Sequence, residues 1–198
     1  MERVVPIILP HPGVYELEEK RSKFIGYCTP VESEAEAKQV IAQVRQAHQK
    51  ANHNVFAYST ISDNIIRMSD DGEPSGTAGM PVLNVFQKTG VINYVCVVTR
   101  YFGGTLLGAG GLVRAYSKAA KGAMEAAEPQ ELIVKTVYRV ICEYSKFDQV
   151  KYLLEKQNIP ILGSDFTTHC TLVVEITEAQ EAEFRKLVIP HLTQVSDM

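Results

Sequence analysis

The sequence predicts an α+β protein of two domains, of which the second is a ferredoxin-like unit. Strand-like and helix-like apolar patterns alternate along the 198 residues, and Pro129 interrupts them after a long helical stretch. Beyond Pro129 the patterns follow the order βαββα, with a last strand expected at residues 188–195, which is the order of a split βαβ unit. We therefore expect an N-terminal domain over residues 1–128 and a smaller C-terminal domain over residues 129–198.

The composition is that of an ordinary globular protein. The chain is 45% hydrophobic and 22% charged, with a formal net charge of −3. No long segment has a basic excess, which argues against a broad surface for duplex DNA. The first apolar stretch, residues 4–9, is too short for a signal peptide, and no run approaches the ~20 apolar residues of a membrane helix. We expect a cytoplasmic protein without a membrane partner.

The four cysteines lie far apart, each within or at the end of an apolar run. They form no Cys-x-x-Cys pair, and no histidine stands at the spacing of a zinc ligand. We expect buried thiols rather than a disulfide framework or a zinc site.

The first strands are expected at residues 14–17 and 24–28. The second of them follows the basic run Lys20-Arg21-Ser22-Lys23. Two interpretations of this run stay open, a solvated edge or a positively charged mouth of the strand.

A helix and a hairpin come next. Ser33 and Glu36 have the spacing of a capping box, and the apolar stripe behind them predicts a helix that ends near Gln49. Residues 55–61 and 65–68 are strand-like and close enough to form a β-hairpin.

Two loops rich in small residues then flank a helix-like segment and an apolar strand at residues 91–99. The first loop, residues 70–79, leads into a helix expected to begin near residues 75–78. The second loop, residues 100–111, leads into a helix expected from Leu112. Five of the 13 glycines lie between positions 103 and 111, and glycine at this density indicates positive φ angles or a close approach of the backbone to a ligand.

A strand, a glycine-rich turn and a helix start leave amide N–H groups unpaired, which favours an anion. Arg100 and Arg114 would add positive charge on either side of the turn. The second loop matches neither the dinucleotide fingerprint, because Val113 stands where a glycine is required, nor a Walker loop. The alternative is that the glycines only permit a tight crossover between strand and helix.

The first loop carries three acids, Asp70, Asp71 and Glu73. Their oxygens could coordinate Mg²⁺, although the spacing fits no calcium loop. Alternatively they cap the following helix, make salt bridges or contact a partner.

The C-terminal half shows no cluster of residues that suggests chemistry. Its expected elements are a strand at 132–143, a helix at 147–157, strands at 161–163 and 170–176, and a helix that ends near Leu187.

Three motifs stand out: Asp70-Asp71-Gly72-Glu73-Pro74-Ser75-Gly76-Thr77-Ala78-Gly79, Thr99-Arg100-Tyr101-Phe102-Gly103-Gly104 and Leu107-Gly108-Ala109-Gly110-Gly111-Leu112-Val113-Arg114-Ala115-Tyr116. With Lys20-Arg21-Ser22-Lys23-Phe24-Ile25 and His53-Asn54, they make the chain resemble the YigZ/IMPACT family over about residues 15–128. The chain departs from the family pattern at Val55, where the family usually has cysteine, so any role of that cysteine is absent here.

The resemblance implies an N-terminal domain with the fold of the second domain of ribosomal protein S5. It also implies a C-terminal domain similar to a domain of translocating elongation factors, and eukaryotic members that regulate translation. Because many unrelated proteins share such folds, the fold does not fix a function.

We therefore expect a translation-related regulatory binding module that contacts RNA, the ribosome or a translation-control protein. Its anion- or partner-binding residues are expected on and beside the two loops: His53, Ser75, Thr77, Arg100, Tyr101, Gly103, Gly104, Gly108, Gly110, Gly111 and Arg114. The alternative is a Mg²⁺-dependent enzyme that acts on a phosphorylated small molecule or nucleotide, with His53 as an acid–base group. We assign no catalytic residue, because no nucleophile or metal constellation stands out. A third hypothesis is a protein–protein surface without a ligand.

Overall fold

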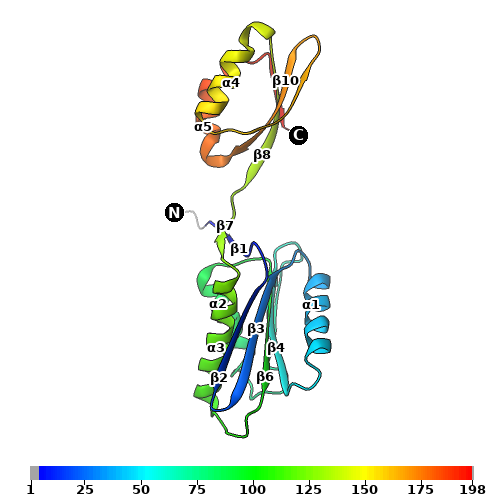
Figure 1. Ribbon diagram of the computed structural model, residues 1–198, viewed down its shortest axis with the longest axis vertical. Coiled ribbons are helices and arrows are strands. Elements are labelled where there is room, and N and C mark those ends of the chain that lie inside the picture. The colour runs from blue at the N-terminus through cyan, green and yellow to red at the C-terminus, as the bar shows by residue number, and fades with distance from the viewer. Residues whose placement is uncertain (1–4, 198) are drawn as a thin grey trace. The chain divides into compact units, whose positions relative to one another are not determined.

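The computed structural model of the protein describes residues 5–197 (Figure 1). The chain divides after Leu132 into two compact units, each with its own core. Within the described residues, no helix is long and apolar enough to cross a membrane. All four cysteines are buried as free thiols, and burial raises the pKa of Cys28 to about 12.

The first unit is built on a five-stranded sheet in which every neighbouring pair is antiparallel. In spatial order the strands are β2 (Gly13–Glu19), β3 (Ser22–Pro30), β6 (Tyr94–Tyr101), β4 (His53–Thr60) and β5 (Ile65–Ser69). A short pair, β1 (Ile7–Ile8) with β7 (Gln130–Glu131), joins the two ends of the unit.

Helices cover both faces of this sheet (Figure 1). Helix α1 (Glu34–Ala47) lies on one face over a small apolar cluster, while α2 (Gly79–Thr89) and α3 (Ala109–Ala126) lie on the other over the main core. Helix α3 can approach the β2–β3 hairpin because glycine faces it. A Cβ at Gly13 or Gly26 would lie 2.1 or 2.4 Å from a backbone oxygen of α3.

The second unit has the ferredoxin-like fold that the sequence predicts. Its elements are β8 (Lys135–Cys142), the 3₁₀ turn Tyr144–Lys146, α4 (Phe147–Lys156), β9 (Ile161–Phe166), β10 (Cys170–Thr177), α5 (Glu178–Leu187), the 3₁₀ turn Ile189–His191 and β11 (Gln194–Asp197). The antiparallel sheet has the order β11-β8-β10-β9, which is the split βαβ arrangement.

Several boundaries differ from the sequence-based expectations. Helix α2 begins at Gly79 rather than near residues 75–78, helix α3 begins one turn before Leu112, and β6 begins at Tyr94 rather than at residue 91. The last strand, β11, covers Gln194–Asp197 rather than residues 188–195. Ser33 caps α1 as predicted, accepting the amide of Glu36 at 3.3 Å. The Glu36 carboxylate, however, accepts the amide of Glu32 at 2.8 Å, so it completes the cap one residue earlier than a capping box would.

Candidate functional site

The first glycine-rich loop is closed by its own aspartate. The carboxylate of Asp70 accepts the amides of Gly76 at 2.9 Å, Ala78 at 3.0 Å and Gly79 at 2.8 Å. Burial raises the pKa of the Asp70 carboxyl, but these three hydrogen bonds outweigh burial and leave the pKa below its usual value. The amides at the start of α2 therefore meet a protein anion, as the capping alternative for Asp70 expects.

Asp71 fastens the same loop to the sheet and to α1. Its carboxylate accepts from Arg45 at 2.6 Å and from the amide of Asn54 at 2.6 Å. Its carbonyl oxygen lies 2.8 Å from Nδ1 of His53. Because a carbonyl only accepts, Nδ1 carries the proton, and Nε2 of a neutral His53 has a free lone pair.

Glu73 joins the first loop to β6 and α3. Its Oε1 accepts from Arg100 at 2.6 Å and from the hydroxyl of Tyr116 at 2.7 Å, and Nε2 of His53 lies 3.8 Å away. Burial, and then the neighbouring Glu73, raise the pKa of Tyr116. Arg100 is only 5% exposed and lies between the rings of Phe24 and Phe102, at 5.4 and 5.5 Å. Its charge is thus engaged inside the protein.

The three acids expected as a metal site are therefore separated by their partners. Asp70 binds amides, Asp71 binds Arg45 and Glu73 binds Arg100. Among residues 5–197 no three His, Cys, Asp or Glu side chains are grouped so that they could hold a metal ion.

The second glycine-rich loop crosses the β2–β3 turn at close range. A Cβ at Gly103 would lie 2.0 Å from the backbone of Arg21, and the Gly103 amide donates to the hydroxyl of Ser22 at 3.2 Å. Gly104 and Gly108 have φ angles of 83° and 72°, which L side chains rarely adopt.

The start of α3 differs from the start of α2. Its N-cap is Gly108, and in the described part of the chain no side chain caps it and no acid lies in its first turn. The amides of Ala109, Gly110 and Gly111 find no acceptor within residues 5–197. The guanidinium of Arg114 lies close by, with Nη1 3.6 Å from where a Cβ of Gly110 would be. Amides and a cation thus gather at this helix start.

A hollow of about 430 Å³ lies between the two loops and is named here the loop hollow. It is lined by Asn52, His53, Glu73, Pro74, Arg100, Phe102, Leu106, Leu107, Gly108, Ala109 and Leu112. Of the site residues expected from the sequence, His53, Glu73, Arg100 and Gly108 meet here. Phe102 and Leu106, which are 44% and 82% exposed, also line it. Leu106 is not among the expected residues, although an exposed apolar residue on a glycine-rich loop is a signal for ligand contact.

Other expected site residues lie elsewhere. The Tyr101 hydroxyl lies 2.9 Å from Nδ1 of His48, the residue that follows α1. The Thr77 hydroxyl donates to the carbonyl of Pro74 at 2.6 Å. Ser75 is exposed, while Gly111 and Arg114 line a separate, smaller hollow beside α3.

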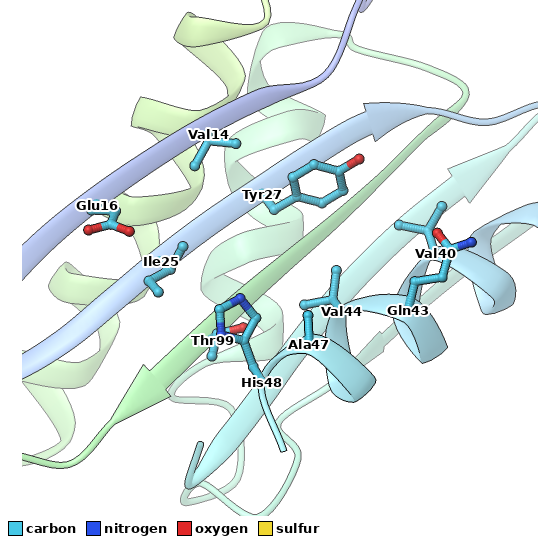
Figure 2. A pocket seen from close by; sticks show the side chains of 10 residues that line it. All are labelled: Val14, Glu16, Ile25, Tyr27, Val40, Gln43, Val44, Ala47, His48 and Thr99. Carbon is cyan, nitrogen blue, oxygen red and sulfur yellow. The ribbon is translucent and has the colours of Figure 1, made fainter. Parts of the chain in front are cut away.

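A further hollow, of about 410 Å³, lies on the sheet face that α1 covers (Figure 2). Side chains of β2, β3 and β6 line it together with those of α1 and the residue after it: Val14, Glu16, Ile25, Tyr27, Val40, Gln43, Val44, Ala47, His48 and Thr99. It contains none of the residues expected from the sequence, and its lining is mainly apolar.

Comparison with known proteins identifies relatives along most of the chain. The Impact N-terminal domain matches residues 20–124, and a domain of unknown function, DUF1949, matches residues 140–189. An IMPACT family member from Haemophilus influenzae is 36% identical over 168 residues, covering 83% of this chain and 82% of that protein. The IMPACT family member YigZ from Escherichia coli is 35% identical over 181 residues, covering 89% of each.

A solved crystal structure of a hypothetical protein has a TM-score of 0.61 and 33% identity, covering 97% of this chain and 95% of that one. The first domain match spans more than half of the chain, and the two bacterial relatives extend through both units. The chain belongs to the IMPACT family.

Proposed function

We propose that this chain is a translation-related regulatory binding module that contacts RNA, the ribosome or a translation-control protein through its second glycine-rich loop and the start of α3. Membership of the IMPACT family supports the translation-related part of the proposal, because the eukaryotic members of that family are expected to regulate translation.

One observation carries the proposed binding face, namely the uncapped start of α3. The amides of Ala109, Gly110 and Gly111 meet no acceptor in the described chain, and the guanidinium of Arg114 lies near Gly110. Free N–H groups at the positive end of a helix dipole, with an arginine one turn further along the helix, favour a phosphate group. Of the three partners, this favours RNA and the ribosome, which carry phosphates.

Arg100 has a different role in this proposal from the one expected at the sequence level. Its guanidinium pairs with the buried Glu73, so it supports the loops rather than binding phosphate. The ring of Phe102 lies 5.5 Å from this guanidinium, and Phe102 is 44% exposed. That ring could stack on an unpaired base, a contact worth about 1–3 kcal/mol.

The alternative of a Mg²⁺-dependent enzyme has less support. The imidazole of His53, with Nε2 3.8 Å from Oε1 of Glu73 in the loop hollow, is the observation that favours it. However, Asp70, Asp71 and Glu73 are each bound to other protein groups, so the loops offer no free set of carboxylates to a hard cation.

The test is a salt-dependent binding assay. Labelled single-stranded RNA is followed by fluorescence anisotropy, and ribosomes by co-sedimentation, at low and at physiological salt. We expect binding at low salt that weakens as salt rises, and a loss of about tenfold in the Arg114→Ala variant. Lys121→Ala is the matched control, because Lys121 lies on the same helix and pairs with Glu125 at 3.5 Å. The proposal fails if neither RNA nor ribosomes bind, or if both variants behave alike.

A further inference from the structure

The turn between β2 and β3 has an unusual backbone for its sequence. Lys20 and Arg21 are its two central residues, with φ angles of 47° and 64°. Two left-handed residues in a row define a turn that asparagine and glycine form most easily. Here two cations occupy it at a cost in backbone strain.

The turn is fixed against the second loop. Ser22, which follows it, is fully buried and accepts the amide of Gly103 at 3.2 Å. Gly103 lies against the backbone of Arg21 so closely that no side chain would fit. The position of Lys20 and Arg21 is therefore set by the same loop that begins α3.

This arrangement places cations from distant parts of the chain around one hollow of about 210 Å³, named here the basic hollow. Its lining residues are Leu17, Glu19, Lys20, Leu107, Gly111, Arg114, Ala115 and Lys118. In the part of the chain that the structure describes, no ion pair engages Lys20, Arg21, Arg114 or Lys118, and Glu19 is not paired with any of them. Lys23 and Lys121, their neighbours in sequence, pair with Glu16 and Glu125.

Three cations and one carboxylate, Glu19, line the hollow, so its net charge is positive and favours an anion. The whole chain is acidic, with a net charge of −3, so this concentration of cations is local and does not form the broad basic surface that duplex nucleic acid requires. Leu107 lines both the basic hollow and the loop hollow. A phosphate in the first would therefore lie one side chain away from the exposed ring of Phe102 in the second.

We propose that the basic hollow binds the phosphodiester backbone of a single-stranded RNA, whose bases reach the loop hollow past Leu107. This inference rests on the proposed function, and it specifies the partner and the surface along which that partner binds. Lys20 and Lys118 contact phosphates on either side of Arg114. The left-handed turn serves to hold Lys20 there.

The experiment measures how the affinity for a single-stranded RNA depends on salt, using fluorescence anisotropy and the full chain. Each phosphate contact that is removed lowers the slope of log K against log salt by about 0.7. We expect that decrease in Lys20→Asn and in Lys118→Gln, with two RNA sequences affected equally. Asparagine tolerates the left-handed conformation, so Lys20→Asn removes the charge and keeps the turn.

Two variants serve as controls, Lys23→Gln and Lys121→Gln, which remove cations that the protein itself pairs. The inference is overturned if Lys20→Asn and Lys118→Gln change the slope no more than these controls, or if duplex RNA binds as tightly as the single strand. If Arg114→Ala still weakens RNA binding in that case, or if only ribosomes bind, the proposed function holds but this inference does not. No binding to either overturns both.

Discussion

The two glycine-rich loops of the first unit differ in what their backbone amides meet. In the first loop, Asp70 accepts three amides and thereby caps the start of α2. In the second loop, Gly108 precedes α3, and within residues 5–197 no side chain takes up the amides behind it. Glycine thus makes both turns possible, but an acceptor in the chain itself decides which helix start remains available to another molecule.

Glu73 links the two loops, and its removal is expected to have the largest effect. Glu73→Ala leaves the buried guanidinium of Arg100 without its partner, which costs about 3–5 kcal/mol of the free energy of unfolding. Glu73→Gln should cost less, because its amide oxygen can still accept from Arg100 and Tyr116. The measurement is urea unfolding by circular dichroism, with hydrogen exchange in β6 to assign the loss to the first unit. If Glu73→Ala lowers the free energy of unfolding by less than 1 kcal/mol, the buried pair of Glu73 and Arg100 does not link the two loops as described.

A smaller effect is expected from the carboxylate that closes the first loop. Asp70→Asn removes the charge that three amides share, and we expect a loss of about 2 kcal/mol at neutral pH. Glu18→Gln is the control, since Glu18 is exposed on β2. Affinity for RNA should not change, because the first loop donates none of the free amides.

The same variant has a defined pH dependence. The folded pKa of Asp70 is below its ordinary value, so its contribution is present above the unfolded pKa of about 3.9 and is lost as the pH falls through the folded pKa. The gap between wild type and Asp70→Asn should therefore narrow as the pH drops below about 4. A gap that stays constant down to the pH of acid unfolding would show that charge is not what the amides recognise.

Sequence reasoning succeeded where the signal is local. The apolar stripes, the cap at Ser33 and the order of elements in the second unit depend on neighbours a few residues apart, and the structure contains them. The site depends on contacts between distant residues. Glu73 meets Arg100 only when the first loop folds against β6. Lys20 lines one hollow together with Arg114 only because α3 packs on the β2–β3 hairpin. Local sequence patterns contain no information about such contacts between distant residues.

The smallest expected effect, that of Gly110→Ala, tests whether the second loop is open. Gly110 has room for a Cβ, which would lie 3.6 Å from Nη1 of Arg114, whereas Gly108 has a φ of 72° and a ψ of 165°. Gly108→Ala should therefore cost about 1–3 kcal/mol, while Gly110→Ala should stabilise the first unit by about 0.5–1 kcal/mol by restricting the unfolded chain. Both are measured by urea unfolding. If Gly110→Ala destabilises as much as Gly108→Ala, the start of α3 is as tightly enclosed as the start of α2, and the contrast between the loops disappears.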